Sequence, residues 1–316
     1  MEVTGSGGVS LWEVNVVTGS KSAYQRRLIN RNRRVASLFL LPNLIGFLVF
    51  MFVPIIMSFG ISFTNWDGFN EIQFVGIDNF KKMFLDEGFR ISLKNTLYYS
   101  VFFVPLTLVA ALLAAAGLNC NIKGIKFYRT AFFLPYITAT VAVVVVWQLL
   151  YHPSMGPINS FLMAIGIENP PKWLSSSKWA MPAVIITSVW KNVGYYMIIF
   201  LAGLQGISAE LYEAADLDGA DSLQKFWYVT IPLLRPIIFF VSIITVINSF
   251  KVFDMVYMLT NGGPGRATNV LVYSIYTEGF RKYNFGYASA MAYVLFLMIM
   301  VVTMIQFRGE KKWGNE

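Results

Sequence analysis

Residues 210–236, ELYEAADLDGADSLQKFWYVTIPLLRP, form a polar stretch between two long apolar runs. Ser208 is suited to cap a short helix here, and Glu210 and Glu213 fall in its first turns, where the helix dipole favours negative charge. Ala214 and Ala215 leave a smooth face. This pattern predicts an ordered protein surface, suited to contact another protein, between two membrane spans.

A turn and a second helical piece follow in the same stretch. Gly219 permits a sharp turn, because glycine adopts left-handed backbone angles without steric cost. Residues 222–229 are predicted to be helical, and we expect Pro232 and Pro236 to end that helix where the next apolar run begins.

The composition indicates a membrane protein. The chain has 316 residues, of which 56% are hydrophobic and only 13% are charged, against about 25% charged in a typical soluble domain. Cys120 is the only cysteine and His152 the only histidine, so the sequence excludes an internal disulfide, a cysteine-rich metal site and a paired-histidine metal site. We therefore expect no catalytic and no metal-binding residues. The phosphate-loop spacing is also absent, so the chain is not expected to bind ATP by that route.

Six uncharged or nearly uncharged runs are each long enough to cross a bilayer, which takes about 20 residues. We predict spans at 35–66, 95–122, 130–151, 179–204, 236–260 and 284–307. Pro54 is expected to kink the first span, and Pro135 to interrupt the third. The predicted fold class is an all-α integral membrane protein with six transmembrane helices.

Shorter segments complete the predicted organisation. Residues 1–35 form a basic leader, of which 1–20 are expected to be poorly ordered, and residues 308–316 form a basic tail. A cleaved signal peptide is disfavoured, because the first apolar run is about twice as long as a signal h-region. Short helices are predicted in 74–84, FVGIDNFKKMF, and in 158–165.

The distribution of positive charge predicts the orientation in the membrane. The net charge is +8, but the basic residues cluster beside apolar runs rather than forming a stripe, so we expect no nucleic-acid partner. Fourteen lysines and arginines lie in the leader, the 123–129 turn, the 208–236 loop and the tail, against nine in the opposite loops. Both termini and the 208–236 loop are therefore predicted to be cytoplasmic.

The spacing of the central stretch resembles the "EAA" cytoplasmic loop of permease subunits in binding-protein-dependent ABC importers. That family has EAA, three residues, Gly, nine residues, Ile, one residue, Leu-Pro, and this chain has Val229 and Ile231 at the two apolar positions. The resemblance implies the type I importer permease fold, with 208–236 as the coupling loop of a permease domain at 36–307. It also implies that the ATPase-coupling residues are Glu213, Ala214, Ala215, Asp216, Gly219, Ala220, Val229, Ile231 and Pro232.

Two further stretches, 190–215 and 250–268, resemble the carbohydrate-uptake branch, which includes the maltose and glycerol-phosphate permeases. The resemblance implies import of a carbohydrate, with an oligosaccharide as the default, across the bacterial cytoplasmic membrane. It implies four kinds of partner: two ABC ATPase subunits, a second and usually non-identical permease, an extracellular or periplasmic solute-binding protein, and membrane lipid. The chain itself would need no cofactor, since ATP and Mg would be bound by the ATPases.

Polar residues inside the predicted spans are candidates for the substrate path, because charged groups in a membrane usually face the bundle interior or a wet cavity. The candidates are Lys191, Asn192, Tyr195, Asn248, Lys251 and Asp254. Two alternatives stay open from sequence. Lys251 and Asp254, spaced i, i+3, can neutralise each other as a structural pair. Tyr195 and its neighbour Tyr196 offer aromatic faces with hydroxyls suited to sugar rings, but both can equally be packing residues.

Two other functions compete with an ATP-driven permease. A secondary transporter or channel of six helices would carry inverted internal repeats and facing interrupted helices, and no such repeat is found. A membrane-embedded enzyme would need a catalytic constellation at a suitable depth, for which one histidine and no cysteine cluster offer little.

Overall fold

The computed structural model describes residues 23–120 and 123–313, and side chains within 35–120 and 123–310. The 1–20 leader and Lys21 lie outside the described residues. The chain divides into two compact units, residues 1–57 and 58–316. The described residues form helices joined by turns and loops, and their only β-structure is one isolated antiparallel bridge, between Thr64 and Phe74.

The first candidate span lies in a helix that begins before it. Helix α1 (Ala23–Phe47) continues through a π-helical turn (Leu48–Phe52) into α2 (Val53–Ile61). The turn ends just before Pro54, where a missing N–H disturbs the regular ladder. The predicted end at residue 66 is wrong, because the helix stops at Ile61 and the chain enters the bridge.

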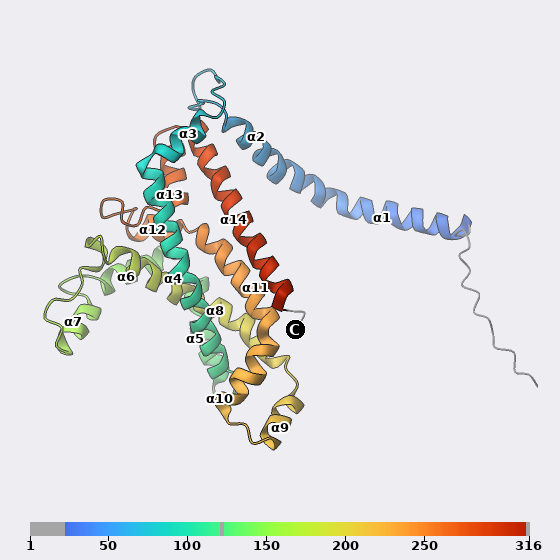
Figure 1. Cartoon of the computed structure of the whole chain (residues 1–316), viewed down its shortest axis with the longest axis vertical. Coiled ribbons are helices and arrows are strands. Elements are labelled where there is room, and N and C mark those ends of the chain that lie inside the picture. The colour runs from blue at the N-terminus through green and yellow to red at the C-terminus, as the bar shows by residue number, and fades with distance from the viewer. Residues whose placement is uncertain (1–22, 121–122, 314–316) are drawn as a thin grey trace, which may run out of the picture. The chain divides into compact units, whose positions relative to one another are not determined.

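The second unit is built around α4 (Glu87–Gly117), which packs against α8 (Ala180–Gln205) and α11 (Ile231–Phe250). A buried apolar cluster fills the space between these three helices, and α14 (Phe285–Trp313) packs on α11 (Figure 1). The helix that contains the second predicted span begins at Glu87, before the predicted start of the span at Asn95, and Asp86 caps it.

The third span is two helices rather than one. Helix α5 (Ile125–Ile137) and α6 (Thr140–Leu150) meet at an angle of 99°. The break was predicted at Pro135, but Pro135 lies within α5. The helix ends at Ile137, and the next residue, Thr138, has an extended backbone.

The helix that contains the fifth predicted span begins before the predicted start at residue 236 and ends before the predicted end at residue 260. Helix α10 (Ser222–Lys225), a π-helical turn (Phe226–Thr230) and α11 form one apolar helix of 29 residues. Pro232 and Pro236 do not end the preceding helix. Pro232 sits at the start of α11, and the π-helical turn before it sends the Ile231 N–H to the Phe226 carbonyl, which accommodates a residue without an N–H.

Beyond Phe250 the chain turns sharply, so the predicted continuation to Thr260 is wrong. Lys251 caps α11, and a separate helix, α12 (Asp254–Leu259), begins three residues later. The remaining elements are α3 (Asp78–Leu85), α7 (Pro157–Ala164), the 3-10 turn Trp173–Ser175, α9 (Ala209–Leu217), α13 (Leu271–Tyr276) and the π-helical turn Thr277–Arg281. Helices α3 and α7 confirm the two short helices predicted from the sequence.

The predicted fold class is confirmed. The described residues hold five helices long and apolar enough to span a membrane, and six such spans if the bent α5–α6 pair is one. Within the second unit, α9 and α10 lie at one end, and α3 and α13 lie near the other (Figure 1).

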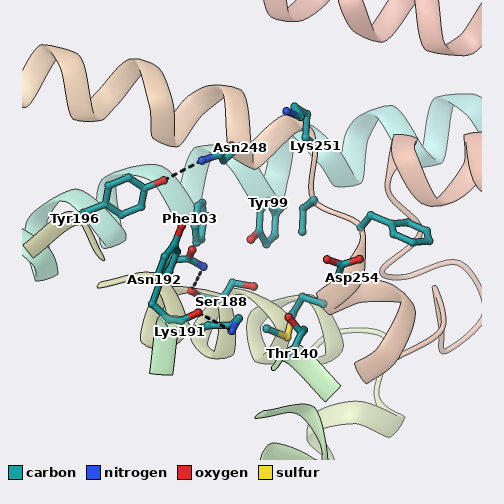
Figure 2. A pocket seen from close by; sticks show the side chains of 14 residues that line it. Tyr99, Phe103, Thr140, Ser188, Lys191, Asn192, Tyr196, Asn248, Lys251 and Asp254 are labelled. Carbon is teal, nitrogen blue, oxygen red and sulfur yellow. Dashed lines mark hydrogen bonds between the residues drawn. The ribbon is translucent and has the colours of Figure 1, made fainter. Parts of the chain in front are cut away.

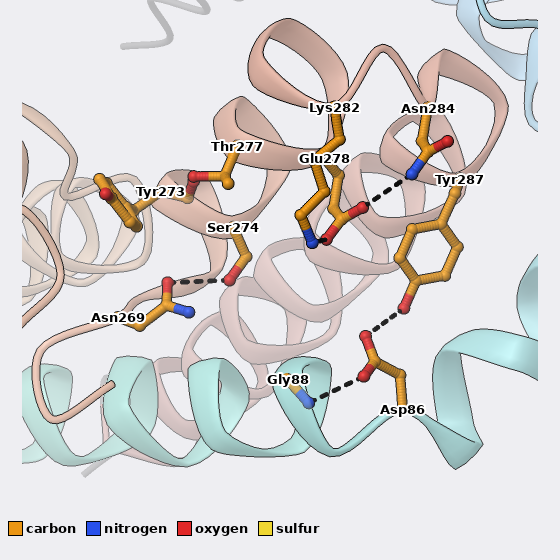
Figure 3. A network of polar contacts seen from close by, with 10 residues as sticks. All are labelled: Asp86, Gly88, Asn269, Tyr273, Ser274, Thr277, Glu278, Lys282, Asn284 and Tyr287. Atoms are coloured by element: carbon orange, nitrogen blue, oxygen red, sulfur yellow. Dashed lines mark hydrogen bonds and ion pairs between the residues drawn. The ribbon is translucent and has the colours of Figure 1, made fainter. Parts of the chain in front are cut away.

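Polar contacts join the start of α4 to α14 at the end of the unit opposite α9 (Figure 3). The Asp86 carboxylate accepts the Gly88 N–H at 2.9 Å and the Tyr287 hydroxyl at 2.8 Å. Burial alone would raise the pKa of Asp86, but the hydrogen bonds from Tyr287, Gly88 and Phe89 outweigh it and hold the pKa below its ordinary value. The ionised carboxylate is therefore the form that joins the two spans.

We expect Asp86→Ala to destabilise this end of the protein by about 2 kcal/mol, because it removes a helix cap and leaves the Tyr287 hydroxyl unpaired. The melting temperature of purified protein should fall, whereas Glu87→Ala, at an adjacent exposed position, should leave it unchanged. Since the pKa of Asp86 is lowered by folding, its contribution is complete above the unfolded value of about 3.9 and is lost as the pH falls through the folded value. Equal melting temperatures for the two variants at neutral pH would contradict this role.

Candidate functional site

The polar loop between α8 and α11 contains helix α9, which ends in a turn with a defined hydrogen-bond pattern. After α9, the N–H of Gly219 donates to the Asp216 carbonyl at 3.0 Å and the N–H of Ala220 donates to the Ala215 carbonyl at 2.9 Å. Gly219 has φ +79°. This pair of bonds around a left-handed residue is the Schellman motif, and it explains physically why the spacing from Ala215 to Gly219 is needed.

Side-chain contacts fasten this turn to the next helix. Lys225 forms an ion pair with Asp216 at 2.6 Å, and the hydroxyls of Tyr212 and Thr230 lie 3.0 Å apart. Asp221 and Gln224 form a capping box at the start of α10. Ser208 occupies the N-cap position of α9 as predicted, but its side chain makes no capping hydrogen bond.

The predicted coupling residues divide into two groups. Those on α9 and its turn lie on or near the surface: Glu213, Ala214, Asp216 and Gly219 are exposed, and Ala215 and Ala220 are half-buried. Val229, Ile231 and Pro232 are half-buried in the helix that becomes the fifth span. Leu217, which the sequence reading did not single out, is 91% exposed on α9. The turn thus has small, acidic and apolar groups at its surface.

One uninterrupted helix connects this turn to the interior of the second unit. The helix from Ser222 to Phe250 has 29 residues, which corresponds to about 40 Å at 1.5 Å per residue. Its far end carries Asn248, and Lys251 caps it. Displacement of the turn can therefore reach these two residues without passing through a flexible segment.

A pocket of about 200 Å³ lies at that far end (Figure 2). Residues of α4, α5, α6, α8, α11 and the 251–255 segment surround it. The lining residues are Tyr99, Phe103, Tyr136, Thr140, Ser188, Lys191, Asn192, Tyr196, Asn248, Lys251, Val252, Phe253, Asp254 and Met255.

Five of the six predicted path residues line this pocket: Lys191, Asn192, Asn248, Lys251 and Asp254. Tyr195 does not. Its ring stacks on Tyr136 with 4.5 Å between centroids, and the neighbouring Tyr196 faces the pocket instead. The Asn248 amide donates to the Tyr196 hydroxyl at 3.3 Å (Figure 2).

The two lysines of the pocket differ in their surroundings. The Lys191 ammonium donates hydrogen bonds to three backbone carbonyls of the α5–α6 break, whereas among the described residues none hydrogen-bonds to the Lys251 ammonium. Lys251 and Asp254 do not lie on one helix, since α11 ends before Lys251 and α12 starts at Asp254. No ion pair joins these two side chains, so the structural-pair alternative is wrong.

The pocket combines aromatic faces with amide, hydroxyl and charged groups. Sequence reasoning missed Tyr99, Phe103 and Tyr136, because nothing in a run of apolar and aromatic residues marks which ones face a hollow between helices. The described residues hold no group of three or more His, Cys, Asp and Glu side chains that could bind a metal ion. Such a lining is suited to bind a polyhydroxylated molecule through stacking and hydrogen bonds.

The chain is similar to known transport proteins over nearly its whole length. It is 38% identical to the probable ABC transporter permease protein YesP of Bacillus subtilis, over 93% of this chain and 96% of that protein. It is 34% identical to the sn-glycerol-3-phosphate transport system permease protein UgpA of Agrobacterium fabrum, over 89% of this chain and 96% of that protein.

A similar fold occurs in a solved structure. A chain in the crystal structure of a bacterial alginate ABC transporter, in complex with an alginate pentasaccharide-bound periplasmic protein, superposes with a TM-score of 0.77 at 26% identity. The match covers 89% of this chain and 94% of that chain.

The family model described as "Binding-protein-dependent transport system inner membrane component" matches residues 104–313. This match contains the 208–236 loop, the helix from Ser222 to Phe250 and most of the pocket lining. The chain therefore belongs to the family of inner-membrane permease components of binding-protein-dependent ABC transporters.

Proposed function

We propose that this permease subunit moves a carbohydrate, by default an oligosaccharide, across the bacterial cytoplasmic membrane by alternating access driven by a partner ATPase. The observation that carries the proposal is the continuous helix from the exposed Schellman turn to the pocket. The chain is a transport subunit and not an enzyme, so the free energy must come from outside it.

The Schellman turn around Gly219, here called the coupling turn, lies within the 208–236 loop and supports docking of an ATPase. A motor subunit that closes on ATP can displace the permease only through a rigid contact, because a flexible tether would absorb the movement. The Lys225–Asp216 ion pair and the capping box hold this turn as one body. ATP and Mg would be bound by two such ATPase subunits, and this chain would need no cofactor.

The pocket supports a carbohydrate as the transported molecule. Tyr99, Phe103 and Tyr196 supply aromatic faces, and Asn192 and Asn248 supply amides. Two similar proteins are named as transporters of sn-glycerol-3-phosphate and of alginate. Sugar rings present apolar faces and hydroxyl edges, which this combination of side chains matches.

The remaining partners follow from the same function. The similar alginate transporter was crystallised with a substrate-bound periplasmic protein, which supports delivery of substrate to this chain by a solute-binding protein. We propose that a second, non-identical permease completes the pathway and that both termini and the coupling turn face the cytoplasm. The end of the unit that carries α3 and α13 would then face outward.

Opposite sides of the membrane should be accessible at Ser222 and Ser175, which are both exposed. In a Cys120→Ser background, which removes the exposed native thiol, an impermeant thiol reagent added to intact cells should label Ser175→Cys but not Ser222→Cys. Permeabilised cells should label both, as a control for reactivity. Labelling of Ser222→Cys from outside would exclude a cytoplasmic coupling turn.

Gly219→Val should weaken ATPase binding and stop uptake. Nothing lies within 4 Å of an added Cβ at this position, so the effect would come from forcing a side chain into a φ of +79°, which costs about 1–2 kcal/mol and distorts the Schellman turn. Purified complexes would be assayed for bound ATPase and for substrate-stimulated ATP hydrolysis.

Gly166→Val is the matched control for this prediction. Gly166 has φ +95° and equally open surroundings, but it follows α7 rather than α9. This variant should retain the ATPase. If Gly219→Val also retains the ATPase and supports uptake, the turn is not the coupling element.

Lys251→Met should raise the substrate concentration required for half-maximal uptake by about tenfold, because a hydrogen bond to a charged group is worth about 1.5–3 kcal/mol. ATPase binding should be unchanged, since Lys251 lies at the far end of the helix from the coupling turn. Lys172→Met, at an exposed lysine outside the pocket, serves as the control. An unaltered uptake curve for Lys251→Met would remove this residue from the path.

A further inference from the structure

The break in the third span creates a problem that the surrounding structure must solve. At the end of a helix the last carbonyls have no intrahelical partner, and inside a membrane an unsatisfied backbone group costs several kcal/mol. Helix α5 ends at Ile137 and α6 starts at Thr140, with their axes at 99°. The freed carbonyls therefore need donors from elsewhere.

Lys191 supplies those donors from the middle of α8. Its Nζ donates to the carbonyl oxygens of Pro135 at 3.1 Å, Tyr136 at 3.3 Å and Thr138 at 2.7 Å. An ammonium group has three N–H donors, so these bonds use all of them. A positive charge at a helix C-terminus is also stabilised by the helix dipole.

The same face of α8 brings α5 close enough for this contact. Gly194 lies three residues after Lys191, and a Cβ at position 194 would overlap the backbone of Phe132 in α5. One residue further, the Tyr195 ring stacks on Tyr136. Helix α5 is thus seated on α8 by a glycine contact, a ring stack and a charged cap at its end.

We propose that Lys191 is a positioning residue that holds the 99° bend of the third span, so that the start of α6 forms part of the pocket wall. Thr140, the first residue of α6, lines the pocket together with Tyr136 at the end of α5. Without the cap, the carbonyls at the break would favour a straighter helix that restores their intrahelical bonds. The bend does not depend on the proposed function, whereas its effect on uptake does.

The bend can be measured in the assembled importer in nanodiscs, with spin labels on Phe127→Cys and Leu149→Cys in the Cys120→Ser background. Both positions are exposed, at 72% and 66%. Each arm from the break is about 15 Å long, so relaxing the bend by about 30° would lengthen the separation by about 5 Å. Pulsed electron paramagnetic resonance resolves a change of that size.

Lys191→Met, which keeps the length of the side chain and removes its donors, should lengthen or broaden the distance distribution. Lys191→Arg should restore the wild-type distribution, because a guanidinium also carries several donors for carbonyls. Asn192→Leu is the matched control: its amide donates only to Ser188 in the same helix, so the distance should stay unchanged whatever happens to uptake.

A wild-type distribution in Lys191→Met would overturn the proposal and leave the lysine acting on substrate alone. If Lys191→Met does not yield assembled complex, Lys191→Gln takes its place. Its amide reaches fewer carbonyls and should broaden the distribution, and a distribution as narrow as wild type would again overturn the proposal. A changed distance with normal uptake would keep the bend-holding role and contradict the pocket as the path.

Discussion

The requirement that every backbone polar group find a partner inside the membrane governs the structure of this protein. Long helices satisfy it within themselves, and α4, α8, α11 and α14 are the four longest helices of the second unit. The exceptions are the places where a helix breaks, and at two of them a specific donor or a change in hydrogen-bond pattern compensates. At the α5–α6 break the donor is the ammonium of Lys191, and before Pro232 a π-helical turn makes the adjustment.

Rigidity is concentrated along one route through the molecule. The coupling turn is closed by two backbone bonds around Gly219 and fastened by an ion pair, and the helix that leaves it does not stop until the pocket. On the other side of the turn, α8 carries Ser188, Lys191, Asn192 and Tyr196 into the same pocket. Both helices that flank the turn therefore contribute residues to the pocket: α11 ends there and α8 runs past it. A movement of the turn would shift these two walls of the pocket relative to α4.

The pocket contains charged groups within otherwise apolar helices, and removing such groups from water costs free energy. Proteins tolerate this cost where function requires it. The two lysines of the pocket have different surroundings. Lys191 uses its donors on backbone carbonyls, which is the basis of its proposed role in the pocket wall. Lys251 has no hydrogen-bond partner among the described residues, so its ammonium can bind substrate in the proposed function. The aromatic residues around them supply apolar faces, so the lining is suited to a molecule with both kinds of surface.

The sequence by itself determined the features that depend on local order. Apolar run length determined the number of candidate spans, and the position of Gly219 determined the turn after α9. The position of charged and amide side chains within apolar runs picked out five residues of the pocket. These succeed because length, glycine conformation and the cost of a buried charge are properties of a short stretch of chain.

Only the tertiary structure decided the rest. From the sequence, Lys251 and Asp254 are spaced as neighbours on one helix, but the chain turns between them. The sequence also does not distinguish Tyr195 from Tyr196, and only the packing of α8 against α5 places Tyr196 at the pocket and Tyr195 on Tyr136. The role of Lys191 was also out of reach, because its three partners lie more than fifty residues away in the chain and are backbone carbonyls, which every residue possesses. Which carbonyls lose their helical partners, and which side chain lies close enough to replace them, is determined by how two helices pack.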